Sequence, residues 1–106
     1  MVSDISTLLS REVNQRSLRP IVAPRVRVRD EEDGAFVFVK DIAEIYELNS
    51  TAKRVLRLCD GTRTIEDILQ TMIKEFDDTP QEIVRNDVNE LLEFFEKIGC
   101  VKFHVK

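Results

Sequence analysis

The side chains that most often carry catalysis or bind metals are few in this sequence and widely spaced. The single histidine is His104, and the two cysteines, Cys59 and Cys100, lie far apart in the chain. Structural zinc sites use four ligands in closely spaced pairs, and a disulfide framework uses more than two cysteines. We therefore interpret both cysteines as small buried hydrophobic residues and predict neither a metal site nor a cofactor.

Adjacent carboxylates occur at Glu31-Glu32 and at Asp77-Asp78, and both pairs fall in expected turns. Acidic residues favour turn geometry, whereas general acid–base catalysis needs carboxylates in a desolvated pocket. The three glycines do not form a dinucleotide-binding, phosphate-binding or nucleophile-elbow motif. We expect no enzymatic activity from this sequence.

One expected helix, which ends at Ile98, carries two groups of side chains. Its core stripe, at steps of four and three residues, comprises Val84, Val88, Leu91, Phe95 and Ile98. At 100° per residue, the flank beside this stripe comprises Ile83, Asp87, Glu90 and Phe94. The flank is either the edge of a wide core stripe or one wall of a groove for a peptide, and the pattern alone favours the first.

Alternating and periodic hydrophobic residues predict the elements that must position this flank. The expected strands are 25–29, 35–39 and 45–48, and the expected helices are 50–58, 65–76 and 80–98. Asn49 or Ser50 caps the first helix, Thr64 with Asp67 forms a capping box for the second, and Thr79 caps the third. The order predicts an α+β, winged-helix-like domain in which a three-stranded antiparallel sheet packs on three helices.

We expect residues 1–20 to form an N-terminal extension and residues 21–106 to form the folded domain. Pro20 and Pro24 suppress helix in the residue before each and bracket an extended stretch. The strand 35–39 is apolar on both faces, with Phe36 and Phe38 on one and two valines on the other. One face can cover the helices. The other requires a cover, either the N-terminal extension or a second copy of the chain in a homodimer.

The length of 106 residues fits one domain, and the net charge of −4 is unevenly placed. Residues 1–29 hold six arginines and two acids, whereas residues 30–106 carry a net charge of −8. An acidic body disfavours nucleic acid as a partner. We find neither an apolar run long enough for a bilayer nor a signal peptide, so we expect a cytoplasmic protein without membrane contact.

Several short motifs together resemble the PqqD family, coenzyme PQQ synthesis protein D. A strand ending in Leu48-Asn49 is followed by Ala52, and the turn Cys59-Asp60-Gly61-Thr62-Arg63-Thr64 follows the first helix. Farther on, Asp87-Val88 with Leu92 and the run Gly-Cys-Val at 99–101 are similar to the closing helix of that family. The resemblance covers about Pro20 to Phe103.

The resemblance implies a non-catalytic peptide chaperone, also called a RiPP recognition element. Such domains bind the leader of a ribosomally made precursor peptide as an extra strand between the third strand and the third helix. They present it to a modifying enzyme, often a radical SAM protein, in PQQ or related biosynthesis. The implied peptide-binding residues are Glu44, Ile45, Tyr46, Glu47 and Leu48 on the strand, and Ile83, Asp87, Glu90 and Phe94 on the helix.

The resemblance thus favours the groove interpretation of the helix flank. Two alternatives remain open from the sequence. One is a winged-helix DNA-binding regulator, and the other is an adaptor that dimerises through the two-sided strand 35–39.

Overall fold

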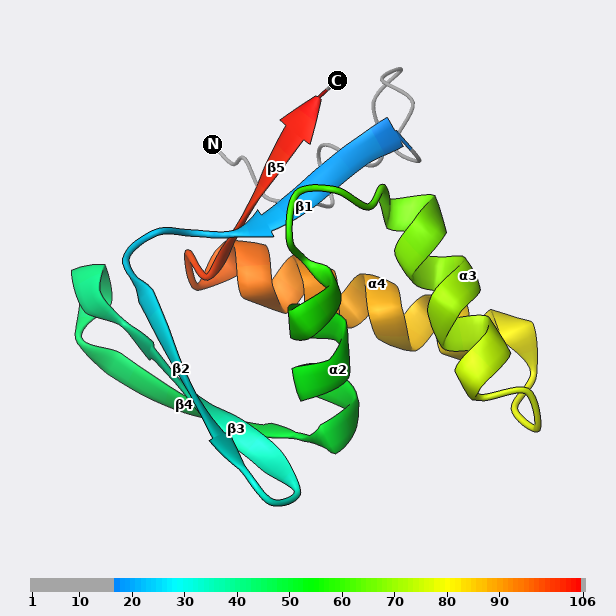
Figure 1. Ribbon diagram of the computed structural model, residues 1–106, viewed down its shortest axis with the longest axis horizontal. Coiled ribbons are helices and arrows are strands. Elements are labelled where there is room, and N and C mark those ends of the chain that lie inside the picture. Colours follow the sequence, from blue (N-terminus) through cyan, green and yellow to red (C-terminus); the bar gives the residue numbers. More distant parts are fainter. Residues whose placement is uncertain (1–16, 106) are drawn as a thin grey trace.

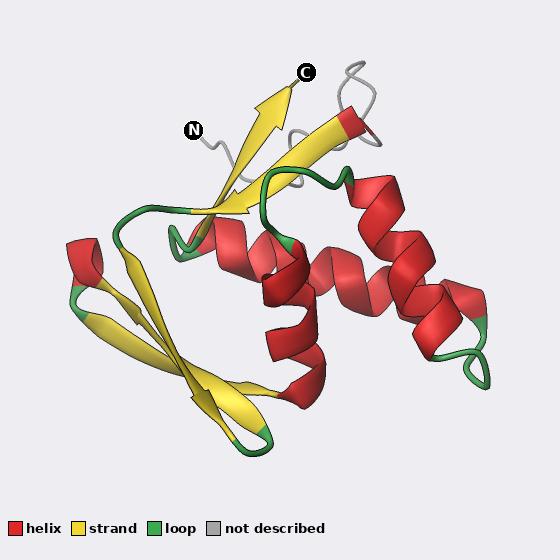
Figure 2. Cartoon of the chain, in the orientation of Figure 1, coloured by secondary structure: helices red, strands yellow, loops and turns green. Residues whose placement is uncertain are grey.

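The computed structural model describes residues 17–105 (Figures 1 and 2). The strands are β1 (Leu18–Val22), β2 (Val26–Glu31), β3 (Gly34–Val39), β4 (Glu44–Asn49) and β5 (Val101–Val105). The helices are α2 (Ser50–Leu58), α3 (Ile65–Glu75) and α4 (Gln81–Lys97), with a short 3₁₀ helix, η2 (Lys40–Ile42). The predicted α+β class, with three helices and a three-stranded antiparallel sheet, is confirmed.

The three-stranded sheet has the order β2-β3-β4, and both pairings are antiparallel. Figure 1 shows this sheet on one side of α2, with α3 on the other side. The hairpin between β2 and β3 turns through Glu32 and Asp33 alone. Val37 and Val39 are buried on the inner face, and Phe36 and Phe38 lie on the outer face, so both faces of β3 are apolar as predicted.

A second, two-stranded sheet pairs β1 with β5 and joins the two ends of the described chain. The expected boundary at Ile21 is too late, because β1 begins at Leu18, whose side chain is only 1% exposed. Pro20 is tolerated in this strand because its carbonyl accepts a hydrogen bond from the Gly61 N–H (2.9 Å) on the side away from β5. The missing proline N–H therefore falls outside the β1–β5 ladder. The rest of the expected extension, residues 1–16, lies outside the described residues.

The first two helices begin where their capping residues predict. The Asn49 side chain accepts a hydrogen bond from the Ala52 N–H (2.8 Å) at the start of α2. Thr64 and Asp67 form both hydrogen bonds of the capping box at α3, each 3.0 Å long. These bonds satisfy backbone N–H groups that have no partner inside the helix.

The third helix begins later than expected. Pro80, not Thr79, is the N-cap of α4, and its carbonyl accepts from the Ile83 and Val84 N–H groups at 3.0 and 3.2 Å. The Thr79 hydroxyl instead lies 3.4 Å from the Asp78 carboxylate, so no side chain caps this helix.

The core lies between the inner face of the sheet and the three helices. Its fully buried side chains include Val37, Val55, Ile68, Leu92 and Phe95. On α4 the core position is Leu92, whereas Leu91, which we expected in the stripe, is half-buried. Among residues 17–105, no helix has the length and apolar character that crossing a membrane would require.

Candidate functional site

The hydrogen-bond pattern of β3 fixes which backbone groups of the sheet remain open. The Lys40 N–H donates to the Arg25 carbonyl (3.2 Å), one position beyond the β2–β3 register. In an antiparallel strand, successive residues direct their N–H and C=O groups to opposite sides. Phe36 and Phe38 therefore direct their backbone groups towards β2, and Val37 directs its own towards β4.

The same alternation leaves backbone groups of β4 without a ladder partner. Tyr46 is the register partner of Val37, so its N–H and C=O face β3. Ile45 and Glu47 consequently direct theirs to the other side, where no strand among residues 17–105 pairs with β4. This edge can accept an additional strand through backbone hydrogen bonds.

An aromatic pair joins β4 to α4 behind this edge. The rings of Tyr46 and Phe94 meet edge to face, with centroids 5.5 Å apart and planes at 85°. Phe95, fully buried, lies behind Phe94 at 6.0 Å. Because Phe94 keeps 37% of its surface exposed, the pair presents an apolar surface that a new strand beside β4 can cover.

Towards the start of α4 from Phe94, the wall of the site is acidic. A hollow of about 430 Å³ is lined by Asn49, Thr51, Asp87, Glu90 and Leu91. Asp87 and Glu90 are exposed, and Leu91 gives the hollow an apolar floor. We call the open edge of β4 together with Phe94 and this hollow the β4–α4 site.

The structure brings most of the predicted residues to this site. Glu44, Ile45 and Glu47 are exposed on β4, and Tyr46 is half-buried beside α4. Leu48 requires correction, because its side chain is only 5% exposed and belongs to the core. Strand alternation points it to the inner face, and its backbone faces β3, so neither is available to a peptide.

Of the predicted helix residues, Ile83 lies nearest the start of α4 and farthest from Phe94. Its side chain is 49% exposed on the first turn of α4, before Asp87, and it does not line the hollow. Asn49, Thr51 and Leu91 do line the hollow, although we did not select them from the sequence. Asn49 offered one signal, because it both ends the edge strand and caps α2.

The turn after α2, from Cys59 to Thr64, has a structural role here. Asp60 accepts hydrogen bonds from the Thr62 N–H (2.9 Å) and hydroxyl (2.6 Å), which hold the pKa of its carboxyl below the usual value. Gly61 adopts a positive φ of 84°, and its N–H bonds to Pro20 of β1. The turn thereby attaches the two-stranded sheet to the helices.

The cysteines are buried and unsuited to nucleophilic chemistry. Burial raises the pKa of Cys59 to about 12 and that of Cys100 to about 11, so both thiols are neutral at physiological pH. Within the described residues, no three histidine, cysteine or acidic side chains gather as a metal ion would require.

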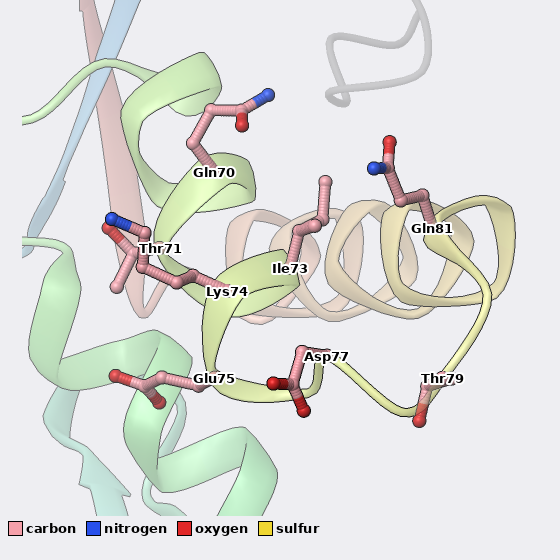
Figure 3. Close-up of a pocket in the computed structure, with 8 residues that line it drawn as sticks. All are labelled: Gln70, Thr71, Ile73, Lys74, Glu75, Asp77, Thr79 and Gln81. Carbon is pink, nitrogen blue, oxygen red and sulfur yellow. The ribbon is translucent and has the colours of Figure 1, made fainter.

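A larger hollow, of about 590 Å³, lies at the end of α3 and the start of α4 (Figure 3). Its lining side chains come from the last turns of α3, from the loop that follows and from Gln81. Glu75 is held there by an ion pair with Arg54 of α2. The lining residues include neither an open strand edge nor an aromatic ring, so this hollow offers an extended peptide less than the β4–α4 site does.

Comparison with known proteins relates this chain to one protein family. The family model of coenzyme PQQ synthesis protein D, PqqD, matches residues 30–101. No protein in the curated set matches.

Three solved structures share the fold. TbiB1 in complex with the TbiA(beta) leader peptide has a TM-score of 0.71 at 13% identity, covering 81% of this chain and 99% of that one. Lasso peptide synthetase B1 complexed with its leader peptide has a TM-score of 0.69 at 17% identity, covering 79% and 98%. The PqqD truncation of Methylobacterium extorquens PqqCD, a functional stand-alone RiPP recognition element, has a TM-score of 0.65 at 21% identity, covering 85% and 94%.

Proposed function

Because this chain belongs to the PqqD family, we propose that it binds the leader of a ribosomally made precursor peptide and presents it to a modifying enzyme. The observation that carries the proposal is the open edge of β4 beside the exposed Phe94 of α4. Two of the structures that share this fold hold a leader peptide, which supports the same conclusion.

In this mechanism, the leader adds to the sheet as a strand beside β4. The backbone groups of Ile45 and Glu47 bond to the leader backbone and fix its register. Alternate leader side chains then face inward, where Phe94 and the hollow beside it receive them. Ordering a disordered leader costs conformational entropy, so we expect affinity near micromolar or somewhat tighter.

The chain itself supplies recognition and the recipient enzyme supplies the chemistry. We propose a radical SAM protein, or another modifying enzyme, as that recipient. The described residues support this division of labour because the buried thiols are protonated and the carboxylates of the site, Asp87 and Glu90, are exposed to solvent rather than desolvated. The exposed acids of α4, among them Glu82, Asp87 and Glu90, disfavour the alternative in which α4 enters a DNA groove.

A second candidate property is self-association through the outer face of the sheet. Ile45 is 64% exposed there beside Phe36 and Phe38, and the Arg29 guanidinium lies 5.2 Å from the centre of the Phe36 ring. Sedimentation equilibrium over a wide concentration range checks it. A homodimer gives a mass that rises with concentration, and a constant monomer mass contradicts dimerisation.

A backbone NMR titration tests the main proposal. Labelled protein of residues 1–106 is titrated with leader peptides from short reading frames encoded beside its gene. We expect shifts concentrated in Glu44–Asn49 and in Asp87–Phe94 for the cognate leader. A well-folded sample that shifts with none of these leaders would overturn the proposal.

A further inference from the structure

The β4–α4 site has two chemically different ends because the strand and the helix run in opposite directions along it. Tyr46, in the middle of β4, meets Phe94 near the end of α4. Asn49, where β4 ends, shares its hollow with Glu90 and Asp87, which come earlier in α4. An extended peptide in this site therefore passes from an aromatic end to an acidic end.

Among residues 17–105, the two acids of the hollow have no cationic partner. In the part of the chain that the structure describes, neither Asp87 nor Glu90 takes part in an ion pair or a side-chain hydrogen bond. The nearest basic residue on the same helix, Arg85, instead reaches Glu66 of α3 at 3.6 Å. A cation brought by a peptide would meet these carboxylates without first breaking an existing pair.

The groups on the helix are spaced somewhat more closely than the side chains on one face of a strand. Phe94 and Glu90 are four residues apart and Glu90 and Asp87 are three apart, so successive groups are separated by about 6 Å and then about 4.5 Å along α4. Side chains on one face of a strand repeat about every 6.6–6.8 Å. Successive inward side chains of a leader strand thus meet Phe94, then Glu90, then the vicinity of Asp87.

From this arrangement, and resting on the proposed function, we infer the chemical class of the cognate leader. Its inward face carries a large apolar side chain that packs against Tyr46 and Phe94. Two or four residues away on the same face, it carries a lysine or arginine that meets Glu90 or Asp87. Backbone pairing and the apolar anchor supply most of the affinity, and the charges select among leaders.

The expected size of the charge effect follows from the exposure of the acids. Exposed ion pairs are weak, so each basic residue should strengthen binding only a few-fold, and this gain should shrink at high salt. An acidic residue at the same position meets like charge and should weaken binding by a similar factor. The site thereby discriminates between leaders that share the same apolar anchor.

A charge-exchange experiment tests the inference. The probe is the leader peptide that shifts the NMR spectrum in the titration above, together with a copy in which the basic residue near its apolar anchor is replaced by glutamate. We expect the copy to bind the natural protein about three- to tenfold more weakly. The double variant Asp87→Lys/Glu90→Lys should reverse this preference.

The matched control is Asp77→Lys/Asp78→Lys, which makes the same change in net charge at the α3–α4 loop, away from the site. It should leave the preference of the protein unchanged. Two results would overturn the inference while leaving leader binding intact: a bound leader with no lysine or arginine two or four residues from its apolar anchor, or equal effects of the two double variants. Failure of every leader to bind would instead remove the proposed function itself.

Discussion

The three-stranded sheet has two outer edges, and they differ in what lies beside them. On β4, the backbone groups of Ile45 and Glu47 point away from β3. The same alternation on β2 directs the backbone groups of Val26 and Val28 away from β3. On the β2 edge, the Val26 N–H returns to the Ala23 carbonyl (3.2 Å). On the β4 edge, the aromatic and acidic side chains of α4 stand beside the open groups.

The two edges also differ in sequence. β2 alternates valine with Arg27 and Arg29, and its Asp30 is held by Arg57 of α2. Charged side chains along an edge strand discourage pairing with another chain. Both edges offer open backbone groups, and we propose that the leader selects the β4 edge. A wall of side chains beside the edge is also needed to give a new strand affinity and register.

The largest expected difference in leader affinity comes from placing a proline on each edge at a residue whose N–H faces away from β3. In Glu47→Pro, the lost N–H faces the open edge, so the β3–β4 ladder stays intact while the leader loses a backbone bond and meets the proline ring. We expect leader affinity to fall at least about tenfold, measured by isothermal calorimetry. Val28→Pro makes the same change on β2, and an equal loss there would contradict the choice of edge.

The wall of the β4 edge is tested by two adjacent phenylalanines. Phe94→Ala removes a ring that is 37% exposed and that a leader would cover, and we expect about a tenfold loss of leader affinity with a smaller loss of unfolding free energy than at Phe95. Phe95→Ala empties a fully buried position and should cost roughly 3–5 kcal/mol of unfolding free energy. Urea titration of both variants separates the two roles. If Phe94→Ala destabilises the protein as much as Phe95→Ala, Phe94 belongs to the core.

The smallest expected effect concerns the outer face of the β4 edge. A leader strand places one outward side chain beside Ile45, and cross-strand pairs contribute about 0.2–1 kcal/mol. Ile45→Ala should therefore weaken leader binding no more than about fivefold, measured by fluorescence anisotropy of a labelled leader. Arg27→Ala, on the β2 edge, is the matched control and should leave affinity unchanged. A larger effect of Arg27→Ala than of Ile45→Ala would place the leader at the β2 edge and contradict the choice of the β4 edge.

Local features of the sequence determined most of the elements. The capping box of Thr64 and Asp67, the cap at Asn49 and the two-sided pattern of β3 are decided by neighbours in the chain, so periodicity and short motifs predicted them. The fold class followed from their order. For the flank with Phe94, the helical pattern alone favoured the edge of a core stripe, and the family resemblance favoured a groove.

Only the tertiary structure decided what depends on segments distant in the chain. The β1–β5 sheet pairs the two ends of the domain, and Pro20 fits there because its nitrogen faces the turn at Gly61 rather than β5. Leu48 is buried because its neighbours on the inner face are core residues. The opposite directions of β4 and α4, which give the site an aromatic and an acidic end, arise from packing between elements, and no local pattern in the sequence encodes them.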